Sequence, residues 1–385
     1  MNLIVISYYF PPDLGAGAFR MGALAELIDK DPDVNLTVLC AKPNRYKQSA
    51  KFKRSDNACV KTFWVPAHNS SIISQAIGYS FFFIQALIYS IFIPRKSIIF
   101  GTSSRFFTMF LSYLISKLRR GKLVIDLRDI FSESLESNFG NNQSFIFRKI
   151  IRLLFYIECK CLNHAKKIFQ VSPAFKKYFI DSVQGDWIDC LNGIDEIFLK
   201  NNKTLVKEKD HITLLYAGNI GIAQSLSSII PQAAKNLPGH KFRIIGDGTD
   251  LENLKSEIHY RNICNVNLLP PVSRDKLVKE YENADILFLH LKDVPAFKRV
   301  IPSKIFEYGA FNKPICAGTS GLSKEFLEKN ISNIFFFEQH SSSSLVDTLQ
   351  KIKLDEENIY FDNFINKYSR KSQMNLMITH LKSLG

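Results

Sequence analysis

Short apolar runs bounded by turn residues alternate along the chain with longer segments of helical periodicity. A continuous apolar run is typical of a strand that is buried on both faces, and strands that alternate with helices form parallel sheets. The first half of the chain is therefore predicted to fold as a parallel sheet covered by helices. Its runs are LIVIS (3–7), LTVLC (36–40), SIIF (97–100), KLVIDL (122–127) and KIFQVS (167–172).

The same alternation begins again after the charged stretch 203–210. The later runs are ITLLYAG (212–218), FRIIGDG (242–248), VNLLP (266–270), ADILFLH (284–290) and KPICAG (313–318). We therefore predict an α/β protein with two Rossmann-like, doubly wound domains that face a cleft. The N-terminal domain is expected to span residues 1–200 and the C-terminal domain residues 205–364. A final helix, about residues 365–385, is expected to pack back on the first domain.

Candidate ligand-binding residues follow the strands of the first half, because open parallel sheets bind ligands beyond the carboxyl ends of their strands. Gly15 and Gly17 follow the first strand. They either allow close backbone approach ahead of a helix or only shape a tight turn. Asp126, Arg128 and Asp129 belong to the motif DLRD, which ends the fifth strand. This motif offers a base flanked by a cation, and a structural ion pair is the alternative.

The strand ends of the second half carry glycines, amides and one histidine. His290 ends the strand ADILFLH and could touch a sugar or a phosphate, although a lone histidine at a strand end is often a structural residue. The remaining candidates lie in the loops GNIGIAQ and GDG: Gly218, Asn219, Gly221, Gln224, Gly246 and Gly248.

The segment RVIPSKIFEYGAFNKPICA places the carboxylate of Glu307 inside a mostly apolar helical pattern. An unpaired buried charge costs several kcal/mol, so this carboxylate is expected to meet a ligand. Pro302 suits a first helical turn, and Ser303 and Lys304 stand at the end of the helix where a phosphate can dock. Glu307 lies one turn further along and can accept two hydrogen bonds from a ribose. An exposed, solvated carboxylate is the alternative.

Taken together, these motifs resemble the retaining GT-B glycosyltransferases of family 4, in particular bacterial O-antigen and capsule enzymes similar to N-acetyl-L-fucosamine transferases. The resemblance covers nearly the whole chain. It implies a UDP-sugar donor bound mainly by the second domain, an N-acetylated deoxyhexose as the transferred sugar, and an undecaprenyl-diphosphate-linked saccharide as the acceptor. The matching segments are ISYYFPPDLGAGAFR, DLRDIFSESL, LNGID, YAGNIGIAQSL, IIGDG and VIPSKIFEYGAFNKPI.

The resemblance matches Glu307 to the second glutamate of the family's E-x7-E motif, whereas Arg299 stands where the first glutamate belongs. This departure leaves the identity of the sugar open. The loop GNIGIAQ lacks the cations that the family uses to neutralise the diphosphate, so Lys304 is expected to supply the charge together with Lys298 or Arg299. No DxD-like acidic pair accompanies the site. We therefore expect a metal-independent enzyme without a cofactor, and family membership implies retention of anomeric configuration.

A formal charge of +14 favours an anionic partner such as nucleic acid, phospholipid or a phosphorylated metabolite. Residues 72–93 carry no charge and are nominally long enough to span a bilayer, but a buried or interfacial helix also explains them. Residues 147–167 mix basic and large apolar side chains, which indicates either membrane binding or a solvated basic face. The N-terminus shows no export signal. We expect a cytoplasmic protein attached peripherally to the anionic inner leaflet.

Three other classes of protein have some of these features. A dinucleotide-dependent oxidoreductase needs GxGxxG after the first strand and an acidic residue after the second, where this chain has LCAKPNR. A nucleotide-sugar 2-epimerase shares the two-domain architecture and remains the enzymatic alternative. A basic nucleic-acid-binding protein is the alternative from another class. Since no aromatic-basic stretch or zinc-finger spacing is present, no nucleic-acid partner is expected.

Overall fold

The computed structural model describes residues 1–13, 15–43, 58–66, 72–103, 106–139, 144–199, 211–354 and 358–385, without the side chains of residues 72–75. These residues form two compact units. Unit 1 comprises Met1–Asn192 together with Arg370–Gly385, and unit 2 comprises Gly193–Ser369. The charged stretch 203–210 lies outside the described residues.

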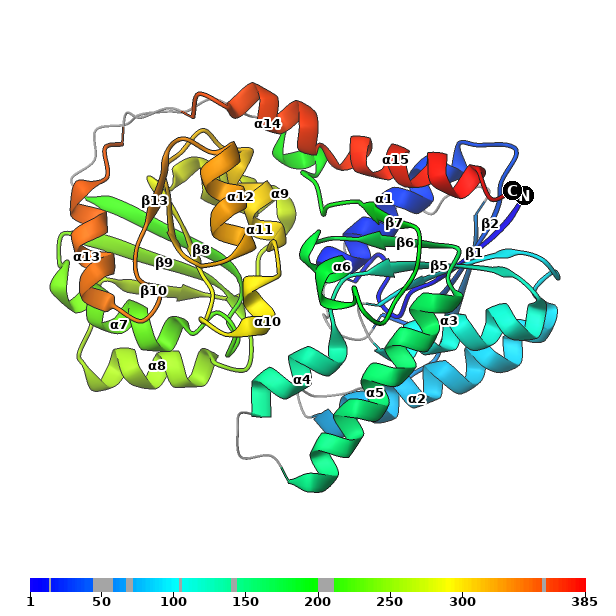
Figure 1. Cartoon of the computed structure of the whole chain (residues 1–385). Coiled ribbons are helices and arrows are strands. Elements are labelled where there is room, and N and C mark those ends of the chain that lie inside the picture. The colour runs from blue at the N-terminus through cyan, green and yellow to red at the C-terminus, as the bar shows by residue number, and fades with distance from the viewer. Residues whose placement is uncertain are drawn as a thin grey trace. The chain divides into compact units, whose positions relative to one another are not determined.

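Unit 1 contains a seven-stranded parallel sheet in the order β3-β2-β1-β4-β5-β6-β7 (Figure 1). The strand order reverses between β1 and β4, which creates the switch point at which doubly wound sheets bind ligands. The strands are β1 (Asn2–Ile6), β2 (Asn35–Ala41), β3 (Cys59–Phe63), β4 (Ile98–Thr102), β5 (Lys122–Leu127), β6 (Lys167–Gln170) and β7 (Trp187–Asp189). The helices are α1 (Ala16–Asp29), α2 (Ile72–Tyr89), η1 (Ser90–Phe92), α3 (Phe106–Arg119), α4 (Phe131–Phe139), α5 (Phe145–His164), α6 (Ala174–Tyr178) and α15 (Arg370–Lys382).

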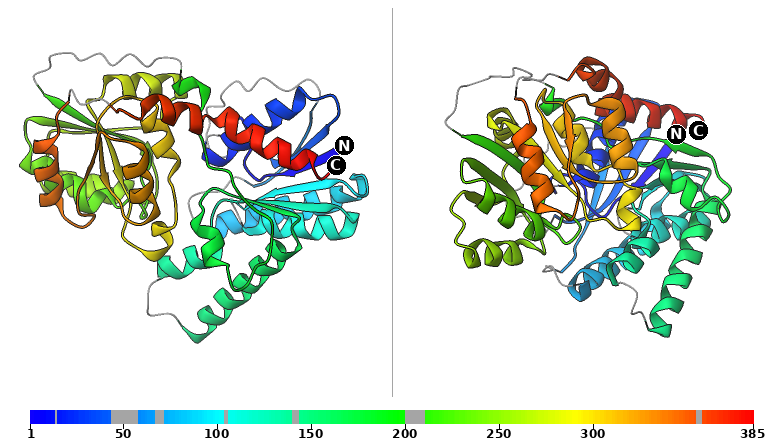
Figure 2. Two further views of the ribbon diagram at one scale, coloured as in Figure 1. Left: turned by 45° about the horizontal axis from the view of Figure 1, so that its top comes forward. Right: turned by 60° about the vertical axis from the view of Figure 1, so that its left-hand side comes forward.

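The sheet of unit 1 is buried on both faces, as its continuous apolar strands require. Side chains alternate along β1: Ile4 and Ile6 join the core under α2, α3 and α5, whereas Leu3 and Val5 join the core under α1 and α15. The further views show α15 lying beside α1 on the second face (Figure 2). The last helix of the chain thus completes the core of the unit that begins it.

Unit 2 repeats the plan with six parallel strands in the order β10-β9-β8-β11-β12-β13, and its switch point lies between β8 and β11. The strands are β8 (Ile212–Asn219), β9 (His240–Asp247), β10 (Val266–Leu269), β11 (Ile286–His290), β12 (Ile315–Gly318) and β13 (Ile334–Phe336). The helices are η2 (Glu196–Phe198), α7 (Leu226–Asn236), α8 (Leu251–Tyr260), α9 (Arg274–Asn283), α10 (Pro295–Lys298), α11 (Ser303–Gly309), α12 (Leu322–Asn330), α13 (Ser342–Lys351) and α14 (Phe361–Tyr368).

The predicted fold class, two Rossmann-like doubly wound units, is confirmed by these sheets. Each predicted apolar run is a strand, while β3, β7 and β13 were not predicted. The C-terminal helical stretch is two helices that are separated at Ser369, and only the second of them, α15, belongs to unit 1. Among the described helices, none is both long and apolar enough to cross a membrane.

Candidate active site

The carboxyl end of β8 is shaped by the absence of a side chain at Gly218. A Cβ atom there would overlap with the ammonium nitrogen of Lys304, and the residue has a φ of 151°. Gly246, at the end of the neighbouring strand, has a φ of 156°, and a Cβ atom there would overlap with the Gly218 carbonyl oxygen. Both positions therefore require glycine. Gly248 plays a similar packing role, because a Cβ atom there would overlap with the backbone of Ile220.

Lys304 brings a positive charge to this strand end. Its Nζ lies 5.2 Å from the centroid of the Tyr216 ring, so the ammonium is enclosed between a ring and the backbone of Gly218. Burial lowers the pKa of Lys304, and the negative charge of Glu307 opposes that shift. Ser303 begins the same helix and is half-buried. Because α11 has only seven residues, we assign the positive charge of the site mainly to Lys304 and less to the helix dipole.

Glu307 is half-buried and is oriented by a buried tyrosine of α9. The Tyr281 hydroxyl donates a hydrogen bond of 2.7 Å to Glu307 Oε2. Burial and the charge of Glu307 raise the pKa of Tyr281, so this hydroxyl keeps its proton and remains a donor. No protein group among the described residues donates to Glu307 Oε1. The carboxylate is therefore a positioned acceptor with one oxygen available, and the fully solvated alternative does not describe it.

His290 braces the loop that follows β8. Its Nδ1 lies 2.6 Å from the Gln224 carbonyl oxygen and its Nε2 lies 2.7 Å from the Gln339 carbonyl oxygen. Burial lowers the pKa of His290, and the two carbonyl acceptors oppose that shift. Both ring nitrogens are occupied, so a direct contact with sugar or phosphate, as the sequence suggested, is contradicted by this arrangement. His290 is a positioning residue.

The loop itself is held by an amide side chain. Gln224 Oε1 accepts hydrogen bonds from Asn219 Nδ2 at 3.0 Å and from the Gly221 amide at 3.2 Å. The Lys292 amide also donates to the Ala223 carbonyl oxygen at 2.8 Å. Asn219, Gly221 and Gln224 therefore fix the shape of the loop beside Gly218.

The other two predicted cations differ from Lys304 in their surroundings. Lys298 Nζ lies 3.0 Å from Asp293 Oδ1, and about half of the Lys298 side chain is exposed. Arg299 Nη1 donates to the Pro295 carbonyl oxygen at 3.4 Å. Since the charge of Lys298 is already paired with a carboxylate, Lys304 is the better placed of the predicted cations.

In unit 1, Asp126 takes part in a fully buried ion pair. Arg20 Nη2 donates to Asp126 Oδ1 at 3.0 Å, and Arg20 Nε lies 3.1 Å from Oδ2. Arg20 also donates to the carbonyl oxygens of Cys190 and Leu191 at 2.8 and 2.6 Å. Because neither side chain of the pair is exposed, Asp126 cannot act as a base toward an acceptor. The alternative interpretation, a structural ion pair, therefore describes Asp126.

Arg128 and Asp129 complete the DLRD motif, and Arg128 Nη1 lies 3.9 Å from Asp126 Oδ2. Arg128 is buried, donates to Asn192 Oδ1 at 3.2 Å, and leaves its Nη1 without a hydrogen-bond partner among the described residues. Burial lowers the pKa of Arg128 to about 10, so it stays charged at neutral pH. Asp129 is exposed beside it. The accessible carboxylate of the DLRD motif is therefore Asp129.

Gly15 and Gly17 lie where α1 begins. Gly15 is the residue that precedes the helix, and a Cβ atom there would meet nothing within 4 Å. Gly17 belongs to the first turn of the helix and is half-buried. Open space next to Gly15 is compatible with the close approach of a ligand.

Comparison with known proteins identifies the class of enzyme. The chain superposes over its whole length on sucrose-phosphate synthase from Thermosynechococcus elongatus, with a TM-score of 0.72, 14% identity and 98% of that chain covered. Residues 198–371 match the protein family described as glycosyl transferases group 1. The chain is a glycosyltransferase with the GT-B fold.

Two further structures resemble this glycosyltransferase. HepE from Anabaena, in complex with UDP and glucose, gives a TM-score of 0.68 at 15% identity, with both chains covered completely. The lipopolysaccharide outer core galactosyltransferase WaaB gives a TM-score of 0.63 at 12% identity, with 99% of each chain covered. A search of curated proteins returns no significant match.

Four residues of the glycosyltransferase were not among the predicted site residues. Arg20 gave a usable signal, because it is the only charge in the helical pattern AGAFRMGALA. Tyr281 and Tyr216 gave no signal in the sequence, since their contacts with Glu307 and Lys304 join segments that are distant in sequence. Arg274, which pairs with Asp195 and lies 4.9 Å from the Phe198 ring, was also missed.

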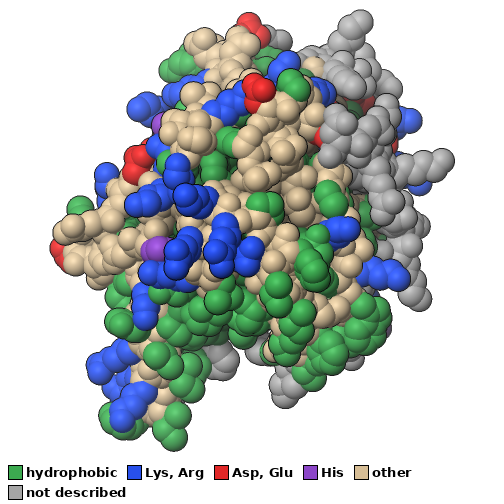
Figure 3. All heavy atoms as spheres, turned by 90° about the vertical axis from the view of Figure 1, so that its right-hand side faces the viewer, with side chains coloured by type: hydrophobic (Ala, Val, Ile, Leu, Met, Phe, Trp, Pro, Cys, Tyr) green, Lys and Arg blue, Asp and Glu red, His purple; other side chains and the backbone are tan. Residues whose placement is uncertain are grey.

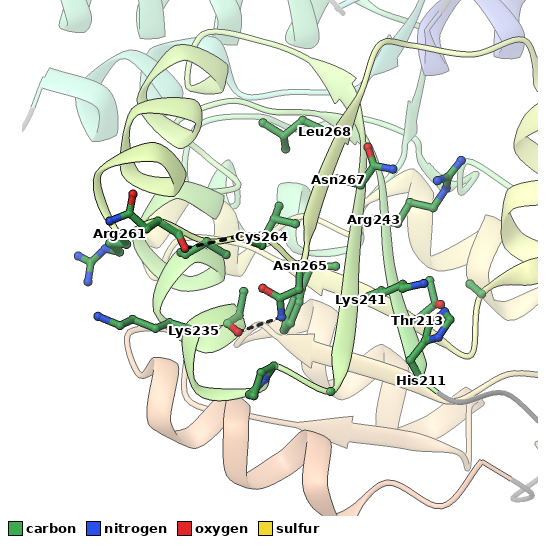
Figure 4. Close-up of a pocket in the computed structure, with 18 of the residues that line it drawn as sticks. His211, Thr213, Lys235, Lys241, Arg243, Arg261, Cys264, Asn265, Asn267 and Leu268 are labelled. Carbon is green, nitrogen blue, oxygen red and sulfur yellow. Dashed lines mark hydrogen bonds between the residues drawn. The ribbon is translucent and has the colours of Figure 1, made fainter.

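A hollow of the glycosyltransferase lies at the amino ends of β8, β9 and β10, opposite to the strand ends that carry the candidate site. It has a volume of about 1220 Å³, and Lys235, Lys241 and Arg243 are among its lining residues (Figure 4). Arg243 is paired with Glu280 at 2.5 and 2.8 Å. Since parallel sheets bind ligands at the carboxyl ends of their strands, we do not place the sugar donor here.

Proposed function

We propose that this enzyme transfers a sugar from a UDP-linked donor to a saccharide carried on undecaprenyl diphosphate during O-antigen or capsule assembly. The sugar is an N-acetylated deoxyhexose such as N-acetyl-L-fucosamine. The donor class is supported by the site on unit 2 and by the likeness to HepE, whose structures contain UDP and UDP-glucose. The assignments of the sugar and of the acceptor rest on the sequence motifs. The likeness to WaaB, a lipopolysaccharide galactosyltransferase, agrees with them.

The observation that carries the proposal is the orientation of Glu307 by Tyr281. A ribose presents two neighbouring hydroxyl groups, and a carboxylate can accept hydrogen bonds from both. The Tyr281 hydroxyl occupies Oε2 from the protein side, so Oε1 can accept from the sugar without reorientation of the side chain. Preorganisation of this kind reduces the entropy that is lost on binding.

Lys304 is assigned to the diphosphate. Its ammonium reaches the β8 strand end because Gly218 has no side chain, and its partial desolvation strengthens its attraction for a phosphate oxygen. As the bond to the anomeric carbon breaks, negative charge grows on the leaving UDP, and a fixed cation stabilises it. This route needs no metal ion, and retention of configuration is part of the same proposal.

Arg128 and Asp129 are assigned to the acceptor side. Arg128 has a buried Nη1 that lies 3.9 Å from Asp126 Oδ2 and makes no hydrogen bond among the described residues, so it can donate to an anionic or hydroxyl-bearing ligand. Asp129 has an exposed side chain beside it. Gly15 and Gly17 are assigned to the close approach of the same ligands at the start of α1. A lipid-linked acceptor further implies that the enzyme works at the inner face of the cytoplasmic membrane as a peripheral, cytoplasmic protein.

Isothermal titration of UDP and a panel of UDP-sugars tests the donor site. Glu307→Gln is expected to weaken donor binding by about tenfold to a hundredfold, because hydrogen bonds to a charged group contribute about 1.5–3 kcal/mol. Glu325→Gln, on the exposed surface of α12, is the matched control and should bind like the parent enzyme. Unchanged affinity in Glu307→Gln would refute the ribose assignment. Transfer activity that disappears in EDTA and returns with Mg²⁺ would refute metal independence.

A further inference from the structure

An uninterrupted row of large apolar side chains is exposed along α2. Ile77, Phe81, Ile84 and Ile88 are 48%, 45%, 57% and 60% exposed, and they follow one another at intervals of four, three and four residues. This spacing places them on one side of the helix. The row, which we call the α2 ridge, continues into η1, where Ile91 and Phe92 are 68% and 75% exposed.

A second exposed apolar row lies on α5. Phe145, Ile146, Ile150 and Leu153 are each exposed by about half or more. Both α2 and α5 pack against α3 over the same face of the unit 1 sheet. The space-filling view shows hydrophobic side chains gathered on the lower part of this side of the molecule, with Lys and Arg side chains along its border (Figure 3). Two rows of this size exceed the scattered apolar side chains that an ordinary surface carries.

The stretch of sequence that contains α2 carries charges of one sign only. The sequence contains no Asp or Glu from Asn57 to Ile125. Within the same stretch, α2 itself has no charged residue, so the positive charges come before and after it in the sequence. Those among the described residues are Lys61, Arg95, Lys96, Lys117, Arg119, Arg120 and Lys122.

Two hydrogen bonds to backbone carbonyl groups hold some of these cationic residues at the end of the ridge. Arg119 Nε donates to the Ile93 carbonyl oxygen at 2.8 Å, and the Lys96 amide donates to the Arg119 carbonyl oxygen at 3.0 Å. These bonds hold the C-terminal end of α3 against the turn that follows η1. Arg95, Lys96 and Arg120 are exposed there. An apolar ridge therefore ends in a basic cluster.

This combination fits a lipid surface better than a second helix. Helices that pair through a four-three spacing carry charges beside the apolar row to set their partner, whereas α2 carries none. An interfacial helix instead lies in the plane of the bilayer with its apolar side chains among the acyl chains, while nearby cations meet anionic headgroups. Since no described helix can cross a membrane, the surface would bind from one side.

We infer that the α2 ridge, η1 and the apolar row of α5 form the face by which this enzyme docks on an anionic lipid bilayer. The inference deepens the peripheral location proposed above and rests on it for the nature of the partner. Docking through this face would bring unit 1 to the surface that holds a lipid-linked acceptor.

Sedimentation of the full-length protein with phosphatidylglycerol–phosphatidylcholine vesicles tests the docking face. Ile84→Asn/Ile88→Asn is expected to lower the partition coefficient at least about tenfold, because two apolar side chains no longer enter the acyl region. Arg95→Gln/Lys96→Gln is expected to lower it by about tenfold or more at low salt, and high salt should remove that difference. Neither change affects a buried contact, so both variants should unfold like the parent protein.

Matched controls lie on unit 2. Ile222→Asn/Ile359→Asn removes two exposed isoleucines, and Lys235→Gln/Lys241→Gln removes two exposed lysines. Both should bind vesicles like the parent. Equal loss in the controls, or no loss in the ridge variant, would overturn the inference. A dimer in light scattering that Ile84→Asn/Ile88→Asn dissociates would show that a second copy covers the ridge. UDP binding, measured without vesicles, separates failure of docking from failure of the proposed activity.

Discussion

The site on unit 2 depends on one pair of residues, because the first has no side chain and so leaves room for the side chain of the second. Gly218 provides the space, and Lys304 fills it with a charged group that lies 5.2 Å from the Tyr216 ring. A lysine at this place is enclosed at some cost in solvation, which appears as a lowered pKa. A bound diphosphate would offset the lost solvation of Lys304 by its attraction to the ammonium group. The position of Lys304 therefore favours ligand binding at the expense of the stability of the ligand-free protein.

Gly218→Ala is therefore expected to weaken UDP binding by about tenfold or more, because the new methyl group overlaps with Lys304 Nζ and displaces the ammonium. The unfavourable backbone conformation should also reduce the free energy of unfolding by about 1–3 kcal/mol. Titration calorimetry and thermal unfolding measure the two effects. Gly239→Ala is the control, since a Cβ atom there meets nothing within 4 Å. Equal UDP affinity in both variants would contradict the role of Lys304.

At the scale of single residues, the sequence predicted polar groups whose spacing is local. Lys304 and Glu307 were recognisable because they stand one helical turn apart in an otherwise apolar segment. The orientation of Glu307 was not predictable, since Tyr281 lies on another helix and reaches it only in the folded unit. The base assigned to Asp126 failed for the same reason: its partner, Arg20, comes from the first helix of the chain.

At the scale of elements, α4 is tied to α5 by a buried carboxylate. Glu158 accepts hydrogen bonds from the amides of Phe131 and Ser132 at 2.8 and 3.4 Å, and also from the Ser132 hydroxyl. These amides belong to the first turn of α4, whose free N–H groups need acceptors. Burial raises the pKa of Glu158 to about 7, while the hydrogen bonds oppose that shift. The first turn of α4, which follows the DLRD motif, is thus capped by an ionisable side chain.

The free energy of unfolding should consequently depend on pH through Glu158. Its folded pKa is about 7 and its ordinary value 4.5, so the folded state holds the proton more tightly. The associated stability is present below pH 4.5 and is lost as the pH rises through 7, by up to about 3 kcal/mol. Urea unfolding between pH 5 and 8 measures this dependence. Glu158→Gln should flatten it, whereas Glu26→Gln, an exposed change in α1, should leave it as in the parent; equal slopes in all three proteins would contradict the assignment.

Strand prediction succeeded for the strands that are buried on both faces, and the three strands that it missed all lie at the margins of the sheets, where only β10 was predicted. The central strands β1, β5, β8 and β11 read as continuous apolar runs. In contrast, β3 is the edge strand of unit 1 and is mostly exposed, so its sequence CVKTF lacks such a run. Strands β7 and β13 have only three residues each, too few for any periodicity to appear.

At the scale of the whole molecule, the first unit contains the last helix of the chain. Met374, Met377 and Leu381 of α15 belong to the same buried cluster as Leu3 and Val5. The ion pair between Lys382 and Asp31 adds a polar contact. The C-terminal residues are therefore part of the core of unit 1.

Met377→Ala should reduce the free energy of unfolding of unit 1 by about 2–5 kcal/mol, because it removes a completely buried side chain and leaves a cavity. Leu376→Ala, at the neighbouring and exposed position, should change it by less than about 1 kcal/mol. Denaturant unfolding, followed by proteolysis to report on each unit, measures the difference. Equal stability of the two variants would show that α15 contributes little to the core.

This connectivity also sets the order of folding during synthesis. The ribosome makes α15 only after residues 193–369, so the nascent first unit must wait for its last helix while the second unit is completed. Throughout that interval, the surface around Leu3, Val5 and Met21 has no Met374 or Met377 to cover it. The unit translated first thus completes its core only after the second unit has been made, and until then it exposes apolar surface of the kind that promotes aggregation.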